Sequence, residues 1–128
     1  MEEKPLVLCD TNILIDFYKE DAEVIKTLRR IGQQNIAVSI VTAGELLYGA
    51  LNKKELNRIK NDLDHLKIVH LTPEIGEKFI KLMVEYSMSH RLSLPDGLIA
   101  ATSLAESIPL YTYNRKDFKY IKGIDLYK

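Results

Sequence analysis

The sequence predicts an α/β fold in which a mostly parallel sheet is covered by helices on both faces. Short apolar and β-branched runs alternate with longer stretches whose apolar residues recur at helical spacing. Chains built from such alternating units form parallel strands joined by crossover helices. The 128 residues match the size of one ordinary domain, so a single domain over residues 1–128 is expected.

The first half of the chain predicts two strands and four helices. An apolar run after Pro5 predicts a buried strand over residues 6–9, and a β-branched run predicts a second over residues 36–40. The helical stretches have apolar residues on one face, and Gly32 ends the second of them. These helices are expected over residues 13–18, 22–31, 43–51 and 53–66.

The second half continues the alternation. Thr72 followed by a proline predicts the start of a helix, because proline is favoured at the first helical position. Helices are expected over residues 73–87 and 94–106, with a short helical turn over residues 116–120. Strands are expected over residues 67–71 and 110–112, with a short edge strand over residues 124–126.

Composition excludes several classes of protein. Lys plus Arg and Asp plus Glu both number 18, and this zero balance argues against a general nucleic-acid coat, so any such contact must be local. Cys9 is the one cysteine, so no internal disulfide is possible. The opening residues do not resemble a signal peptide, and no window reaches the roughly 18 consecutive apolar residues of a membrane span. A cytoplasmic protein without membrane contact is expected.

Four acidic residues stand where strand-like runs give way to helix starts. Asp10 follows the first predicted strand and Glu45 the second, while Asn114 and Asp117 follow the fourth. Ligands of open parallel sheets bind at the carboxyl ends of the strands, so these side chains are expected at one edge. Asp96 opens a helix that precedes a strand, and strand order alone does not place it there.

Each acid also has an explanation as part of a helix cap. The segments 42–45, 93–96 and 114–117 each place an acid three residues after a cap-forming residue, as in a capping box. Asp10 could itself cap the helix that follows it. The two explanations are partly compatible, because a helix N-terminus favours a nearby carboxylate by roughly 0.3–1 kcal/mol.

A cluster of these acids would require a cation or a shared proton. Two like charges 4 Å apart cost about 4 kcal/mol at an effective dielectric constant of about 20. Mg²⁺ and Mn²⁺ prefer oxygen ligands and can activate a bound water for attack on a phosphodiester. His65, His70 and His90 lack zinc-type spacing, and the chain has no phosphate-cradling loop motif. The pattern therefore favours metal-dependent phosphoryl chemistry.

Three segments taken in order resemble the PIN-domain ribonucleases. They are LVLCDTNILIDFYK, VSIVTAGELLYGA and LPDGLIAATSLAESIPLYTYNRKDF, and the resemblance spans residue 6 to about residue 120. It is closest to the small VapC-type toxins of toxin–antitoxin pairs. The resemblance implies a three-layer α/β/α sandwich, an acidic pocket for Mg²⁺ or Mn²⁺, and hydrolysis of RNA, with transfer RNA or ribosomal RNA as candidate substrates.

The resemblance also assigns roles to residues. The positions that match the family's metal-binding and catalytic acids are Asp10, Glu45, Asp96 and Asp117. Thr11 and Asn12 match the polar pair beside the first acid, and Asn114 matches the asparagine that precedes the last one. Thr112 and Asn114 are further candidates for ligands or for groups that position water.

RNA contacts and protein partners are expected on the same basis. Arg115, Lys116 and Lys119 form a basic run beside the last acid and could contact RNA, or could simply solvate the surface. Tyr111, Tyr113 and Tyr120 could stack on bases, although packing explains them as well. The resemblance further implies a homodimer and a cognate antitoxin. The stretch 51–66 is amphipathic and offers an interface.

Two other functions remain open at this point. Asp10 could be the nucleophile of a phosphatase or phospho-accepting domain, although such folds usually place a second acid two residues later, where this chain has Asn12. Alternatively, the chain could be a non-catalytic PIN-like binding module in which the acids only cap helices.

Overall fold

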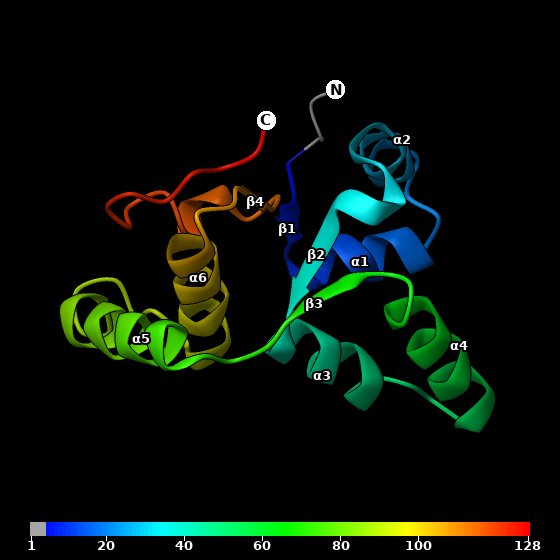
Figure 1. The fold of residues 1–128 in the computed structure, drawn as a ribbon, viewed down its shortest axis with the longest axis horizontal. Helices are drawn as coiled ribbons and strands as arrows, with labels where there is room; N and C mark the ends of the chain where they lie inside the picture. The colour runs from blue at the N-terminus through cyan, green and yellow to red at the C-terminus, as the bar shows by residue number, and fades with distance from the viewer. Residues whose placement is uncertain (1–4) are drawn as a thin grey trace.

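Four short parallel strands form the central sheet of the computed structural model, which describes residues 5–128 (Figure 1). Their order across the sheet is β3-β2-β1-β4, and every neighbouring pair is parallel. The strands are β1 (Val7–Cys9), β2 (Ile36–Ser39), β3 (Lys67–Val69) and β4 (Leu110–Tyr111). The carboxyl ends of the two central strands, β1 and β2, therefore lie side by side.

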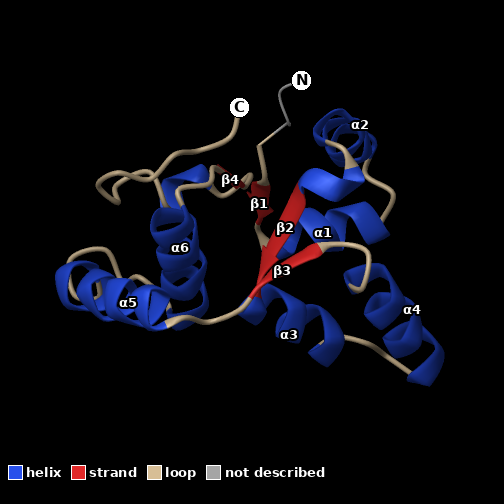
Figure 2. Cartoon of the chain, in the orientation of Figure 1, coloured by secondary structure: helices blue, strands red, loops and turns tan. Residues whose placement is uncertain are grey.

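Six α-helices surround this sheet within the described residues, together with two short 3-10 helices (Figure 2). The α-helices are α1 (Thr11–Tyr18), α2 (Ala22–Ile31), α3 (Ile40–Tyr48), α4 (Lys53–Leu63), α5 (Pro73–Tyr86) and α6 (Leu94–Glu106). The 3-10 helices are η1 (Gln33–Asn35) and η2 (Arg115–Asp117). In the described chain, no helix combines the length and the apolar character that crossing a membrane requires.

The two faces of the sheet bury separate cores. Val7 and Cys9 of β1 belong to a core shared with α1, α2, α3 and α4. Leu8, between them, belongs to a second core shared with α5 and α6. This alternation follows from the two-residue period of a strand. Figure 1 shows the same division, with α1 to α4 on one side of the sheet and α5 and α6 on the other. The predicted three-layer α/β/α sandwich is confirmed.

Side-chain caps explain where most of the helices begin. At each cap an oxygen of the capping side chain accepts a hydrogen bond from a backbone N–H of the first helical turn, which typically stabilises the helix by about 1 kcal/mol. The residues that cap in this way, three positions before the N–H they bind, are Asp21, Ser39, Asn52, Thr72 and Ser93. The predicted starts of α2, α4, α5 and α6 coincide with those observed.

Several predicted elements have other bounds in the structure. The helix expected over residues 13–18 begins at Thr11, the helix expected over residues 53–66 ends at Leu63, and the strand expected over residues 67–71 ends at Val69. The helix expected over residues 43–51 begins at Ile40, because Ser39 both ends β2 and caps the helix. The turn expected over residues 116–120 is the 3-10 helix η2. The edge strand expected over residues 124–126 is reduced to a single parallel bridge between Leu126 and Leu110.

Candidate active site

Asp10 is the most buried of the predicted acids, with 4% of its surface exposed. It follows β1 directly and is the N-cap of α1, where its Oδ1 accepts a hydrogen bond of 2.7 Å from the backbone N–H of Thr11. Its Oδ2 accepts a 2.8 Å hydrogen bond from the hydroxyl of Thr112, which follows the neighbouring strand β4. Both carboxylate oxygens are therefore held by groups at the carboxyl edge of the sheet.

Glu45 is fixed from a different segment, α3. Its Oε1 accepts a 2.8 Å hydrogen bond from the hydroxyl of Thr11. The Thr11 hydroxyl also lies 2.9 Å from that of Thr42, to which Ser39 donates over 3.2 Å. Because each hydroxyl carries one hydrogen, donation by Thr11 to Glu45 requires Thr42 to donate to Thr11. The chain of hydroxyls thus points its hydrogens toward the carboxylate of Glu45.

The capping-box explanation of Glu45 is wrong. That explanation required Thr42 to be the N-cap of the helix, but Ser39 is the N-cap and its Oγ accepts from the N–H of Thr42. Glu45 therefore lies in the second turn of α3, beyond the reach of an N-cap. Its position is instead that of a side chain directed from the helix toward the end of β1.

Asp96 is the third acid, in the first turn of α6. Ser93 caps this helix by accepting a 3.2 Å hydrogen bond from the N–H of Asp96, so the expected cap is present. A helix that leads into a parallel strand runs opposite to that strand, which brings its N-terminus to the carboxyl edge of the sheet. Since α6 leads into β4, this geometry places Asp96 beside the end of β1. The capping and site explanations are compatible here.

Asp117 and the two asparagines border this group. Asp117 is half-buried at the end of η2, and its N–H donates to the carbonyl of Asn114 over 2.9 Å. The side chain of Asn114 makes no cap hydrogen bond to η2, while its N–H donates to the hydroxyl of Thr112 over 3.0 Å. The capping-box explanation of the segment 114–117 is therefore wrong. Asn12, the other asparagine, is exposed in the first turn of α1.

The acids influence one another electrostatically. Burial raises the pKa of Asp10, hydrogen bonds from Thr112 and Thr11 partly oppose this, and the charges of Glu45 and Asp117 raise it further. The pKa of Asp96 is raised from 3.8 to about 6, mainly by burial and then by the charges of Asp10 and Asp117. The carboxylates from four separate segments thus share one neighbourhood, in which they repel each other.

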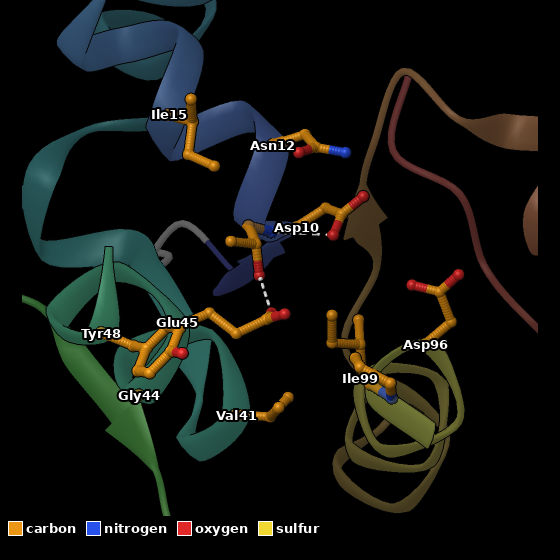
Figure 3. Close-up of a pocket in the computed structure, with 11 residues that line it drawn as sticks. Asp10, Asn12, Ile15, Val41, Gly44, Glu45, Tyr48, Asp96 and Ile99 are labelled. Carbon is orange, nitrogen blue, oxygen red and sulfur yellow. Dashed lines mark hydrogen bonds between the residues drawn. The ribbon is translucent and has the colours of Figure 1, made fainter. Parts of the chain in front are cut away.

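A cleft of about 540 Å³ opens at this edge of the sheet (Figure 3). Asp10, Glu45 and Asp96 line it, and Figure 3 shows their carboxylates directed toward a common space. Asn12 also lines the cleft, whereas Asp117 and Asn114 are not among its lining residues. Its apolar walls are formed by Ile15, Val41, Tyr48, Pro95 and Ile99.

The oxygen atoms around the cleft suit a hard divalent cation. Within residues 5–128, no three or more His, Cys, Asp or Glu side chains form a group that would hold a metal ion as they stand. Mg²⁺ usually binds through one or two carboxylates and keeps several water ligands, so a closed cage is not required. Carboxylate, hydroxyl and amide oxygens at the cleft match this preference, and a cation would relieve the repulsion among the acids.

Comparison with known proteins identifies the family. The model of the PIN domain matches residues 7–124. The chain belongs to the PIN-domain family. This PIN domain is 30% identical over 129 residues to Ribonuclease VapC1 of Methanocaldococcus jannaschii, and the match covers 98% of this chain and 90% of that protein. The predicted resemblance is confirmed.

Solved structures agree with this assignment. A toxin–antitoxin complex from Klebsiella pneumoniae contains a chain that superposes on this PIN domain with a TM-score of 0.79 and 34% identity, covering 92% of this chain and 94% of that one. VapBC2 from Rickettsia felis, bound to a DNA fragment from its promoter, gives a TM-score of 0.78 and 26% identity over 95% of this chain and 97% of that one.

The PIN-domain site contains residues that the sequence did not reveal. Ser39 and Thr42 build the hydroxyl chain that leads to Glu45, and Tyr48 and Val41 line the cleft. The available signal was a hydroxyl residue at the end of the second strand and another three residues later, of which Thr42 resembled an ordinary helix cap. Arg115, Lys116 and Lys119 are all exposed beside η2, so their contact with RNA stays a prediction.

Proposed function

We propose that this PIN domain is a divalent-metal-dependent endoribonuclease of the VapC type. In this proposal Asp10, Glu45, Asp96 and Asp117 bind Mg²⁺ or Mn²⁺. The observation that carries it is the cleft at the carboxyl edge of the sheet, which Asp10, Glu45 and Asp96 line from three separate segments. The charge of Asp117 raises the pKa of both Asp10 and Asp96, which supports its inclusion. Relatives named Ribonuclease VapC support the activity, and dependence on divalent metals is general among such PIN-domain ribonucleases.

Each side chain has a distinct task in this proposal. Thr112 and the N–H of Thr11 orient the carboxylate of Asp10, and the hydroxyl of Thr11 orients Glu45. Asp96 completes the binding set from the opposite wall of the cleft. Mg²⁺ held by these acids would supply an activated water and would neutralise charge on the phosphate. We assign Asp117, Asn12 and Asn114 the task of orienting the attacking water or the phosphate.

The reaction is an in-line displacement at phosphorus. The water oxygen forms a bond to phosphorus as the bond to the 3′ oxygen breaks, and the 3′ oxygen takes up a proton. The products are a 3′-hydroxyl and a 5′-phosphate, as the family resemblance implies. The exposed side chains of Arg115, Lys116 and Lys119 would contact the RNA backbone. Transfer RNA and ribosomal RNA are the candidate substrates.

A toxin role follows from the relatives. The structural neighbours include toxin–antitoxin complexes, which supports a cognate antitoxin as the partner of this chain. The homodimer is proposed from the family resemblance alone. A cavity of about 810 Å³ between α1, α2 and α4, with Leu63 and Leu66 on its wall, offers a surface for such a partner. This location agrees with the interface expected over residues 51–66.

Cleavage of mixed RNA tests the proposed function. The wild type should cut RNA with Mg²⁺ or Mn²⁺, should stop when EDTA is added, and should be inactive as Asp10→Asn. Asp125→Asn, which changes an exposed acid outside the cleft, is the matched control and should cut like the wild type. Release of phosphate from a small phosphomonoester would favour the phosphatase instead. No cleavage under any condition would favour a binding module.

A further inference from the structure

An aromatic stack stands next to the acids and has no role in the site described above. The imidazole of His90 lies on the ring of Tyr120, with centroids 4.0 Å apart and planes 11° from parallel. Tyr86 meets both rings edge-on, at 5.6 Å from His90 and 5.1 Å from Tyr120. Tyr86 is the last residue of α5, and His90 lies in the turn after it. Tyr120 lies after η2, about thirty residues further along the chain.

The stack is held rigidly at its base. Tyr86 is buried, and its hydroxyl accepts a 3.1 Å hydrogen bond from the N–H of Lys122, two residues after Tyr120. The carbonyl of Tyr86 accepts from the N–H of His90 over 3.0 Å, and the hydroxyl of Ser89 lies 2.8 Å from Nδ1 of His90. Both rings are therefore positioned before any ligand arrives, which lowers the entropy that binding costs.

The stack borders the acid cluster and is open on one side. Burial raises the pKa of Tyr120, and the charges of Asp96 and Asp117 raise it further, so the phenol lies within their field. Tyr120 is half-buried, whereas His90 is exposed. A pair that served packing alone would be buried on both rings. The imidazole of His90 therefore lies on the solvent side of the pair.

We propose that the His90–Tyr120 stack is a subsite for one unpaired base of the RNA strand whose phosphodiester lies at the acids. The base stacks on the exposed imidazole of His90. Every base has a π-face, so such a subsite tolerates sequence but requires an unpaired nucleotide. The exposed cations of Arg91, Lys119 and Lys122 flank the stack and suit the neighbouring phosphates. This inference rests on the proposed ribonuclease function and adds where the strand is gripped.

An abasic scan tests the subsite. A short single-stranded RNA is prepared intact and with one abasic residue moved along its length, and its affinity is measured for the Asp10→Asn protein, which cannot cut it. One abasic position should weaken binding by roughly five- to a hundredfold, the range expected for one stacked base. His90→Ala in the same background should bind intact RNA equally weakly and should lose nothing more at that position.

Matched variants separate a ring contact from a structural effect. His90→Phe keeps a ring and should retain the abasic profile, while His70→Ala removes an exposed histidine that directly follows β3 and should change nothing. Thermal unfolding checks that each variant folds. The subsite is refuted, and the ribonuclease function is retained, if the wild type cleaves RNA but the abasic scan gives the same profile with and without His90→Ala. If the wild type neither binds nor cleaves RNA, both proposals are refuted.

Discussion

At the scale of single residues, the state of Asp10 depends on its two hydrogen-bond donors. The hydroxyl of Thr112 favours the charged carboxylate, in opposition to burial and to the neighbouring acids. The family resemblance identified Asp10, but the partner that orients it became visible only when the ends of β1 and β4 were found side by side. A contact between residues 10 and 112 has no signal in a single sequence.

Thr112→Val should weaken metal binding. The substitution keeps the shape of the side chain but removes the hydrogen bond to Asp10. The pKa of Asp10 therefore rises, and a proton competes more strongly with the cation for its carboxylate. A hydrogen bond to a charged group is worth about 1.5–3 kcal/mol, which corresponds to a loss of Mn²⁺ affinity of roughly ten- to a hundredfold. Calorimetric titration measures this, with Thr112→Ser as the control that retains the hydroxyl. Equal Mn²⁺ affinities of the Thr112→Val variant and the wild type would contradict a role of Thr112 in orienting Asp10.

Asp96→Asn should change how stability depends on pH. The pKa of Asp96 is raised to about 6 in the folded protein, so between pH 3.8 and 6 the folded state binds more protons than the unfolded state. This group therefore stabilises the fold below that range and loses its contribution as pH rises through it. In metal-free buffer the variant should equal the wild type at pH 3.5 and unfold roughly 3–8 °C higher at pH 7.5. If the unfolding temperatures of the variant and the wild type differ by the same amount at every pH, the pKa of Asp96 is not raised in the folded protein.

At the scale of elements, the junction between β2 and α3 explains one failure of sequence reasoning. Ser39 and Thr42 are both good cap residues, and the sequence favoured Thr42 because an acid follows it three residues later. Pairing of Ser39 with Val69 in β3 fixes Ser39 as the last strand residue, so the helix starts directly after it. Tertiary pairing therefore decided the boundary, and with it the position of Glu45. The strand pattern also failed to place Asp96, which only the family resemblance assigned to the site. In the structure its position follows from the direction of α6, which runs back across the sheet before the chain enters β4.

Packing of α5 against α6 is expected to control the position of Asp96. A Cβ on Gly97 would meet Sδ of Met83 at 2.9 Å and the ring of Phe79 at 3.1 Å, whereas a Cβ on Gly76 would meet no atom within 4 Å. Gly76→Ala should therefore stabilise the protein by up to about 1 kcal/mol through helix propensity. Gly97→Ala should lose that gain by displacing α6 from α5, and it should lower RNA cleavage. Denaturant unfolding and cleavage rates measure the pair, and equal stabilisation by both variants would contradict the tight packing.

At the scale of the whole molecule, alternation of apolar runs with helical stretches was enough to predict the layers. The order β3-β2-β1-β4 could not be predicted, because no residue pattern records which strands are neighbours. Asp10, Glu45 and Asp117 nevertheless belong to one edge, since each comes after a strand, every strand is parallel, and all the carboxyl ends lie at that edge. The positions of Asp10 and Glu45 at this edge could therefore be predicted without the strand order. The cleft walls and the hydroxyl chain could not, because they depend on which strands are neighbours.

Zero net charge leads to a prediction about salt. With no general positive field, RNA affinity should depend on a few local cations beside η2. Replacing Arg115 and Lys116 with Ala should weaken binding and make the slope of log affinity against log salt shallower by roughly 1.4, because each contact to single-stranded RNA contributes about 0.7. Lys53→Ala with Lys54→Ala, two exposed lysines of α4, is the control that should leave the slope unchanged. An unchanged slope for the first pair would exclude this basic run from the RNA interface.

The central claim is that the acids at the carboxyl edge of the sheet jointly bind a divalent cation. Anomalous diffraction from crystals soaked in Mn²⁺ tests it most directly, because it locates the ion without reference to activity. The account predicts an anomalous peak in the cleft, at a coordination distance of roughly 2.1 Å from a carboxylate oxygen of Asp10 or Asp96, and the loss of that peak in Asp10→Asn. A cleft without a peak, in a protein that still cleaves RNA in the presence of EDTA, would contradict it.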